Sequence, residues 1–246
     1  MDDSARDPYL VPGLIRGLEA LQAFSPQTPE LTLGDIAARL GVSRSAAFRT
    51  VHTLVEHGYL LPVGESRRFC LGPSVLRLSY GYHAGREMLE IARPALEALR
   101  AETGWSAHLT VRDGRHVFYL LRLPSHGAAT SIVHVGSRLP AAGTAMGRIF
   151  LSALPEHELR RLHSDLTGDQ VAAVIARARE DEGAASIEQI GTFESGIAAV
   201  AAPVRDMGNT VIAAVGSALP APEVPDAVRR ATIRAAVSIS RGLGTA

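Results

Sequence analysis

The sequence predicts an α+β chain in two parts. Apolar residues recur at helical spacing from Val11 to about His57, and we expect three helices there, before any strand. Further along, the turn signals Asp113–Gly114 and Met207–Asn209 each separate two apolar runs of strand length. Strands joined by hairpins, with helices before, between and after them, are typical of an antiparallel sheet covered by helices.

Composition limits the classes of protein. The chain has 246 residues, 46% of them hydrophobic, and no apolar run of about 18 residues that could span a bilayer. The start of the chain is acidic and has no apolar signal core, so we expect a cytoplasmic protein without a membrane partner. The single cysteine, Cys70, excludes an internal disulfide and a multi-cysteine zinc site, and we interpret it as a packing residue. We expect neither a metal nor a cofactor.

All 25 basic residues are arginines, and the formal net charge is zero. The absence of lysine excludes Schiff-base chemistry and the phosphate-binding lysine of a P-loop. The charge is uneven, however, because six arginines between Arg39 and Arg77 face only two acids, Glu56 and Glu65. This local excess is compatible with a nucleic-acid partner.

The second and third helices form a helix-turn-helix pattern. Thr32 and Ser43 stand at the N-cap positions, and Gly41 stands where the second helix must end. The turn is then only about three residues long, so the helices must cross steeply.

A small hairpin follows this pattern. Residues 59–63 and 67–71 read as two strands around a turn at residues 64–66, with arginines near the tip. A helix-turn-helix followed by a basic hairpin is a winged helix. Pro73 can open a short helix that includes Tyr80, and a second domain begins at about Gly85.

The third helix predicts how DNA is read. Ala47, Val51 and Leu54 would face the core, which leaves its N-terminal outer face toward base edges. For Arg49, a phosphate contact or an internal ion pair is as plausible as a base contact. We interpret the two wing arginines as phosphate contacts, with a merely solvated turn as the alternative. Phe48 and His52 are interpreted as packing residues. The predicted DNA-binding residues are Thr32, Ser43, Arg44, Ser45, Ala46, Arg49, Arg67 and Arg68.

The second part contains more elements. Helices are expected at residues 86–102, from Gly143–Thr144 to about 154, from Pro155, at 169–181 and at 223–241, and strands at 105–111, 116–123, 130–135, 197–204 and 210–217. The helix that starts at Thr144 presents free backbone amides and a positive dipole end, which suit a carboxylate without lysine or arginine.

Five blocks, in the right order and separation, carry a resemblance: RGLEALQAF with LTLGDIAARLGVSRSAAFRTVHTLVEHGYL, FCLGPSVLRL, RLPAAGTAMGRIFLSALP and GIAAVAAPVRDMGNTVIAAV. The chain resembles the IclR family of bacterial transcriptional regulators along nearly its whole length. The resemblance implies a winged helix-turn-helix domain at residues 1–72, a linker helix at 73–84, and a GAF-like effector-binding and oligomerisation domain at 85–246. It also implies homodimers or homotetramers on double-stranded operator DNA. The subgroup that controls aromatic-acid catabolism often opens in a similar way.

The resemblance also implies an effector site between the helix start and the sheet. Its lining would be Ser131, Leu139, Thr144, Ala145, Met146, Gln189, Ile197, Ala199, Gly216 and Ala218. Family members that bind very small keto acids carry polar side chains at three of these positions, where this chain has Ala199, Gly216 and Ala218, and Thr192 replaces a frequent glutamate. The pocket should be roomier and less polar, which favours a larger, aromatic acid. Alternatively, the small residues only permit tight sheet packing.

Enzyme signatures are missing from the sequence. There is no G-x-S-x-G elbow, no dinucleotide-binding glycine pattern and no cysteine pair, so we expect no catalytic residues. His157 and His163 are six residues apart and would lie on different faces of a helix, unlike metal ligands spaced by four. The sequence therefore predicts a DNA-binding regulator of catabolic genes that responds to a small organic acid. An enzyme or carrier domain fused to a protein-interaction winged helix is the alternative.

Overall fold

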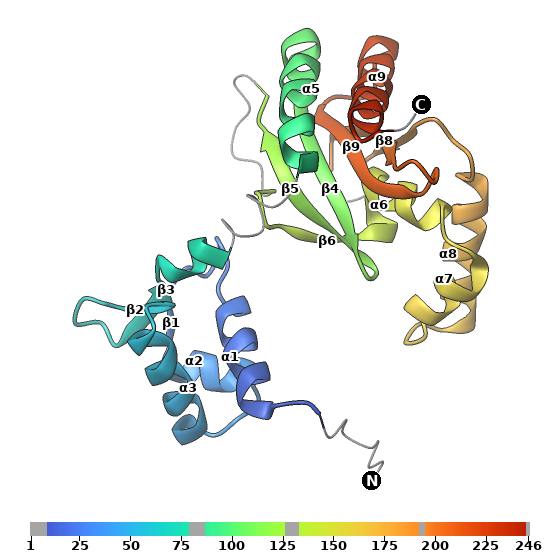
Figure 1. Cartoon of the computed structure of the whole chain (residues 1–246). Helices are drawn as coiled ribbons and strands as arrows, with labels where there is room; N and C mark the ends of the chain where they lie inside the picture. Colours follow the sequence, from blue (N-terminus) through green and yellow to red (C-terminus); the bar gives the residue numbers. More distant parts are fainter. Residues whose placement is uncertain (1–8, 79–86, 126–132, 192–194, 245–246) are drawn as a thin grey trace. The chain divides into compact units, whose positions relative to one another are not determined.

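The computed structural model describes residues 9–78, 87–125, 133–191 and 195–244. Contacts divide the chain into two compact units, Met1–Gly85 and Arg86–Ala246, each with its own apolar core (Figure 1). The fold is α+β, as the sequence predicts. Within the described residues, no helix has the length and apolar character needed to cross a membrane.

The N-terminal unit combines three helices with a three-stranded sheet of order β1-β3-β2. Its elements are α1 (Pro12–Gln22), β1 (Leu31–Thr32), α2 (Leu33–Arg39), α3 (Arg44–Glu56), β2 (Leu60–Val63) and β3 (Arg68–Leu71). Ile36, Val51 and Leu60 are fully or almost fully buried in its core. The expectation that three helices precede any strand was wrong, because Leu31 pairs with Phe69 of the hairpin. Two residues are too few to show the alternation typical of a strand.

The helix boundaries follow from the caps that the sequence predicts. Thr32 forms a capping box, in which its side chain accepts a hydrogen bond from the Asp35 amide and the Asp35 carboxylate accepts one from the Thr32 amide. Ser43 accepts from the Ala46 amide at the start of α3. Gly41, with φ of +61°, takes the left-handed conformation that lets the chain turn after α2.

Each of the two wing strands, β2 and β3, begins one residue later than expected. The strands are antiparallel and pair Leu61 with Cys70. Its tip turns through residues 64–67, and Arg67 takes a φ of +54°, which is uncommon for a residue with a side chain. Residues 74–78 are helical after Pro73. The rest of the expected linker helix, with Tyr80 and Gly85, lies outside the described residues.

The C-terminal unit is a six-stranded antiparallel sheet of order β6-β5-β4-β9-β8-β7 with helices on both faces. Its elements are α5 (Glu87–Thr103), β4 (Ser106–Asp113), β5 (His116–Leu123), β6 (Arg138–Pro140), a 3₁₀ turn (Ala141–Gly143), α6 (Ala145–Ser152), α7 (Glu156–Leu162), α8 (Gly168–Glu180), β7 (Ile187–Ile190), β8 (Ile197–Arg205), β9 (Val211–Pro220) and α9 (Asp226–Gly242). Helices α5 and α9 lie side by side on one face, and α6 crosses the other (Figure 1).

Two strands differ from the expectation. Residues 133–135, the described part of the strand expected at 130–135, form no strand, because the chain turns at Gly136 with φ of +90°, and β6 follows at Arg138. Strand β7 was not predicted at all. It is a four-residue edge strand in which only Ile187 is buried. Because Glu188 and Gln189 interrupt the apolar residues, the sequence shows no apolar run of strand length here.

Candidate nucleic-acid interface and effector site

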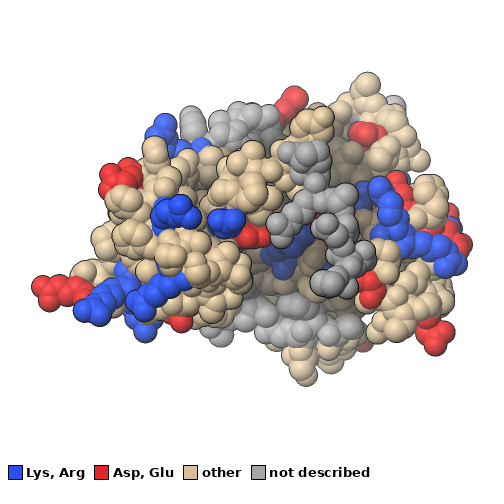
Figure 2. All heavy atoms as spheres, turned by 90° about the horizontal axis from the view of Figure 1, so that it is seen from below, with Lys and Arg blue, Asp and Glu red and all other residues tan. Residues whose placement is uncertain are grey.

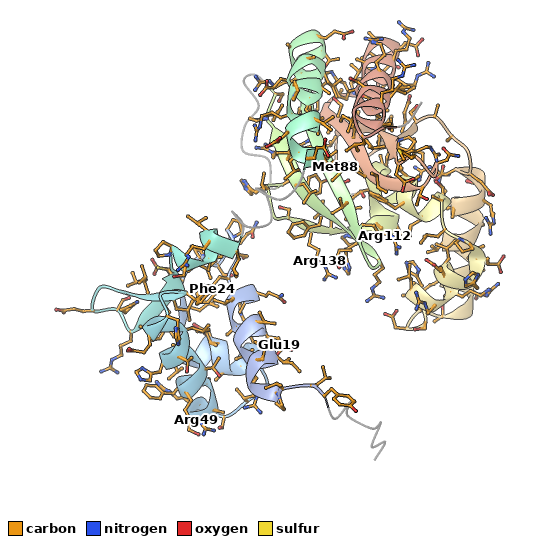
Figure 3. All side chains as sticks on the ribbon, viewed as in Figure 1. Glu19, Phe24, Arg49, Met88, Arg112 and Arg138 are labelled. Carbon is orange, nitrogen blue, oxygen red and sulfur yellow. The ribbon has the colours of Figure 1, made fainter. Side chains whose placement is uncertain are left out.

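Helix α3 separates a core face from an exposed face, as the sequence predicts. Ala47 and Val51 are buried against the rest of the N-terminal unit, whereas Arg44 and Ser45 near the start of the helix are exposed. Arg49 points outward on the side of the unit away from the core residue Phe24 (Figure 3). A shallow groove runs along this face, lined by Leu33, Arg44, Ser45, Phe48 and Arg49. The outer face of α3 can therefore enter a DNA groove without disturbing the core.

Both predicted caps use their hydroxyls within the protein. The Thr32 hydroxyl donates to the Asp35 carboxylate (Oγ1 to Oδ2, 2.8 Å), and the Ser43 hydroxyl lies 3.1 Å from that of Ser45. Ala46 is half-buried behind them. The hydroxyls of Thr32 and Ser43 thus fix the helix starts, and direct DNA contacts by these residues stay predictions.

The arginines of the helix and the wing are exposed and unpaired. The guanidinium groups of Arg44, Arg49 and Arg67 make no hydrogen bond or ion pair with any described residue. The pKa of the Asp35 carboxyl is lowered chiefly by its hydrogen bonds with Thr32 and less by the charge of Arg68. On the face shown in Figure 2, basic side chains stand among acidic ones. The DNA-binding potential is therefore local, as the net charge of zero requires.

The interpretation of Phe48 and His52 as packing residues was wrong. Phe48 is 57% exposed and stacks on His52, with ring centroids 6.0 Å apart. The two residues are four apart on the outer face of α3, so they meet each other rather than the core. They extend the surface formed by Arg44 and Arg49.

The predicted effector residues lie on the sheet face that α6 covers. Register places Gln189 of β7, Ala199 of β8 and Ala218 of β9 in one row across the strands. Ser106 of β4 continues this row beyond Ala218. Because directly paired residues share a face, these side chains all point to the same side as Ala201 and Ala214, which pack with α6 residues.

The small residues on this face are not equally covered. A Cβ at Gly216 would overlap the side chain of Met146, so helix packing already explains that glycine. Ala199 and Ala218, in contrast, are only half-buried and stand directly opposite each other. Leu139 and Ile197, near the edges of the sheet, are also half-buried, and Ser131 and Thr192 lie outside the described residues. Ala199 and Ala218 therefore remain partly exposed, unlike Gly216, which lies against Met146 of α6.

The start of α6 is built as the sequence predicts. Thr144 is buried, and its Oγ1 accepts a hydrogen bond from the Gly147 amide at 3.0 Å. The amides of Ala145 and Met146, also buried, belong to the first turn, which has no acceptors within the helix. The Gln189 side chain donates to the Gly143 carbonyl (Nε2 to O, 2.6 Å) and ties β7 to this helix start.

Three polar residues on the same face were missed by sequence reasoning. Ser106, His108 and Arg122 follow the register of the row, since His108 pairs with Gly216 and Arg122 pairs with His108. His108 Nδ1, Arg122 Nε and Gln189 Oε1 are buried without a hydrogen-bond partner among the described residues. The signal was present in the sequence as polar residues at alternating positions of a buried strand.

No group of three or more metal-ligating side chains was found in the described part of the chain. His157 is exposed on α7, whereas His163 is buried at the end of that helix, with Nδ1 3.0 Å from the Leu159 carbonyl oxygen. The two histidines thus have different surroundings, and the interpretation of this segment as a solvated helix face holds for His157 but not for the buried His163.

A winged helix-turn-helix unit joined to a helix-covered antiparallel sheet defines the class of ligand-responsive DNA-binding regulators. The family model described as "Bacterial transcriptional regulator IclR C-terminal" matches residues 81–241, and the "IclR helix-turn-helix domain" model matches residues 13–63. The chain belongs to the IclR family of transcriptional regulators.

Relatives with recorded roles support this assignment. The chain is 30% identical to the Pca regulon regulatory protein of Pseudomonas putida over 85% of this chain and 74% of that protein. It is 29% identical to the p-hydroxybenzoate hydroxylase transcriptional activator of Acinetobacter baylyi, over 87% of this chain and 83% of that one. An IclR homologue from Microbacterium hydrocarbonoxydans, solved in complex with 4-hydroxybenzoate, shares the fold at 24% identity, with a TM-score of 0.79 over 94% of this chain and 98% of that one.

These similarities are to regulators and not to enzymes. The protein is therefore a transcriptional regulator without an assigned reaction, and the alternative of an enzyme or carrier domain is not favoured.

Proposed function

We propose that residues 1–72 bind double-stranded operator DNA in the cytoplasm, with α3 in the major groove and the wing beside it. Arg44, Ser45 and Arg49 would contact base edges, and Arg67 and Arg68 would contact phosphates. The observation that carries this proposal is the set of exposed arginines on α3 and the wing that have no carboxylate partner in the described part of the chain. Unpaired arginines can bind a base or a phosphate without first breaking an internal ion pair.

Selection from a random-sequence duplex pool tests this proposal. The full chain should enrich one sequence class, and the enriched duplex should bind roughly a thousandfold or more tighter than a scrambled duplex at the same salt concentration. Equal affinity for enriched and scrambled DNA would contradict operator recognition.

The effector proposed for residues 85–246 is a small aromatic acid. It would lie over Ala199 and Ala218, with its carboxylate at the first turn of α6 beside Thr144. Three points support this. Ala199 and Ala218 are half-buried, and the helix start at Thr144 is buried. One relative is named as the transcriptional activator of p-hydroxybenzoate hydroxylase, and one homologue of the same fold was solved in complex with 4-hydroxybenzoate. Arg122, on the same sheet face, is a second possible binding group for the carboxylate. Its Nε is buried and has no hydrogen-bond partner among the described residues.

Titration calorimetry with benzoate, 4-hydroxybenzoate, pyruvate and glyoxylate tests the effector class. The aromatic acids should bind best, and Ala199→Phe or Ala218→Phe should abolish their binding by filling the space while operator binding persists. Preference for glyoxylate or pyruvate would contradict the aromatic class, and unchanged affinity in both variants would place the effector elsewhere.

The position of the carboxylate is tested separately. Thr144→Ala removes one cap and should weaken binding by only about 1 kcal/mol, since the donors are backbone amides. Complete loss of acid binding in Arg122→Gln, with normal binding in Thr144→Ala, would move the carboxylate to Arg122.

A homodimer or homotetramer completes the proposal. Leu14 and Leu18 of α1 are 62% and 49% exposed, which leaves an apolar stripe that a second copy can cover. Two heads on one DNA face would also give the full chain a higher operator affinity than an isolated fragment up to about Tyr82. Sedimentation of the wild type and of Leu14→Arg tests this, and an unchanged oligomer in the variant would exclude α1 as the contact.

A further inference from the structure

Among the residues on the α6 face of the sheet, His108 is buried yet keeps one ring nitrogen unused. Its side chain is 5% exposed, and its ring meets the Tyr119 ring edge-on with centroids 5.6 Å apart. His108 pairs with Gly216, and its neighbour Ser106 pairs with Ala218, one of the two half-buried alanines. His108 therefore lies on the same sheet face as the proposed effector site, beside the row that contains Ser106 and Ala218.

The hydrogen bonds of Ser106 decide which ring nitrogen carries the proton. The Ser106 hydroxyl lies 2.6 Å from the Ala218 carbonyl oxygen, which can only accept, so its single proton is used there. Ser106 Oγ is also 2.8 Å from His108 Nε2 and must accept from that nitrogen. The proton of the neutral ring is thus on Nε2.

The other nitrogen is then an acceptor without a donor. Burial, with a contribution from the Arg122 charge, lowers the pKa of His108 to about 3, so the ring is neutral at physiological pH. Nδ1 is buried and has no partner among the described residues. A buried acceptor left without a hydrogen bond is costly, and such groups in native proteins call for an explanation.

We propose that His108 Nδ1 accepts a hydrogen bond from a hydroxyl group of the effector, which makes the regulator selective for hydroxylated aromatic acids. The inference rests on the proposed function, because it assumes that an aromatic acid occupies this face. A ring hydroxyl supplies the donor that Nδ1 lacks, and a carboxylate cannot, since it only accepts. Ser106 acts as the positioning residue that holds the receptive tautomer.

Calorimetry with benzoate and the three monohydroxybenzoates tests selectivity. Wild type should bind at least one hydroxybenzoate about tenfold more tightly than benzoate, the upper range for one neutral hydrogen bond. His108→Phe, which keeps an aromatic ring beside Tyr119, should bind benzoate and that hydroxybenzoate equally. Ser106→Ala should reduce the preference, because Nδ1 can then carry the proton.

His116→Phe is the matched control. His116 also has a buried, unpartnered Nδ1, but it lies at the far end of β5, paired with Asp113 and Pro140. The preference should survive in this variant. In addition, the ¹⁵N resonance of His108 Nδ1 should shift on binding of the hydroxybenzoate and not on binding of benzoate.

The outcomes separate this inference from the proposed function. If no aromatic acid binds wild type, the proposed effector class fails. If acids bind but wild type does not distinguish benzoate from any hydroxybenzoate, or if the preference survives in a folded His108→Phe, the role of His108 is excluded and acid binding stands. Should His108→Phe not fold, wild-type selectivity and the Nδ1 resonance still decide.

Discussion

The two units of this protein use the same basic residue in different ways. In the N-terminal unit, no arginine between residues 9 and 78 lies within 4 Å of a carboxylate oxygen. In the described part of the C-terminal unit, nine arginines do so: Arg115, Arg138, Arg148, Arg160, Arg177, Arg179, Arg229, Arg230 and Arg234.

This difference means that paired arginines contribute mainly to the stability of their own unit, whereas unpaired arginines remain available to bind DNA. An arginine paired within its own unit contributes its charge locally and is largely neutralised at a distance. An unpaired arginine keeps its positive potential for phosphates, and its guanidinium donors stay available for a base edge. A net charge of zero is therefore compatible with a local positive potential at the unpaired arginines of α3 and the wing, which we propose as the DNA-binding surface.

The largest effect on stability is expected for a paired arginine that is buried. Arg148 of α6 donates from Nε and Nη2 to the Asp181 carboxylate at 2.7 and 2.5 Å, and both side chains are at most 10% exposed. Arg148→Ala removes both short hydrogen bonds to the buried Asp181 carboxylate and leaves it with Arg177 alone, whose Nε lies 3.8 Å from Oδ2. The free energy of unfolding should fall by about 3 kcal/mol, the lower end of the range for breaking a buried pair. Urea unfolding followed by the fluorescence of Trp105, the single tryptophan, measures this in the C-terminal unit. A loss below about 1 kcal/mol would show that the pair contributes little.

The unpaired class should affect DNA binding instead. Arg44→Ala and Arg49→Ala should each weaken operator binding by roughly 1–3 kcal/mol if the side chain contacts a base, with little change in unfolding. A competition band-shift assay with enriched and scrambled duplexes measures the loss. If both variants bind like wild type while Arg67→Ala changes sequence preference, helix and wing have exchanged roles.

Arg122, which has no carboxylate partner among the described residues of the C-terminal unit, pairs with His108 in the sheet and contributes to its low pKa. Burial, together with the charge of Arg122, lowers the pKa of His108 from 6.5 to about 3 in the folded state. Below pH 6.5 the unfolded chain therefore binds a proton that the folded chain does not bind. For this group, the free energy of unfolding decreases by about 1.4 kcal/mol for each unit by which the pH is lowered. The slope of unfolding free energy between pH 6 and pH 4.5 should be shallower by that amount in His108→Phe. Identical slopes would mean that His108 titrates normally.

The smallest effect is expected for an exposed pair. Arg160 and Glu156 are four residues apart on α7, with Nη2 2.7 Å from Oε1, and both are well exposed. Arg160→Ala should change the unfolding free energy by only about 0.3–0.5 kcal/mol and leave operator affinity unchanged. A fall in operator affinity comparable to that of Arg44→Ala would undermine the division between the two classes.

The sequence predicted the local structure around the proposed DNA-binding residues better than the arrangement of the proposed effector residues. Caps such as Thr32 and Ser43, the turn at Gly41 and the face of α3 are local features, so short-range patterns determine them. The proposed effector site, in contrast, depends on register across β7, β8, β9 and β4, which brings Gln189, Ala218 and Ser106 into one row from distant segments. His108 could not be recognised from its neighbours, because its significance depends on the Ala218 carbonyl more than a hundred residues away. Phe48 was misjudged because an aromatic residue in a helix usually packs inward.

The salt dependence of operator binding distinguishes an unpaired arginine that contacts a phosphate from a paired one. For wild type and for Arg67→Ala, the logarithm of the binding constant is measured against the logarithm of the salt concentration, with Arg160→Ala as the paired-arginine control. If the unpaired wing arginine contacts a phosphate, Arg67→Ala should lower the magnitude of the slope by about 1 and weaken all sequences alike, while Arg160→Ala keeps the wild-type slope. Equal slopes for all three proteins would contradict the account.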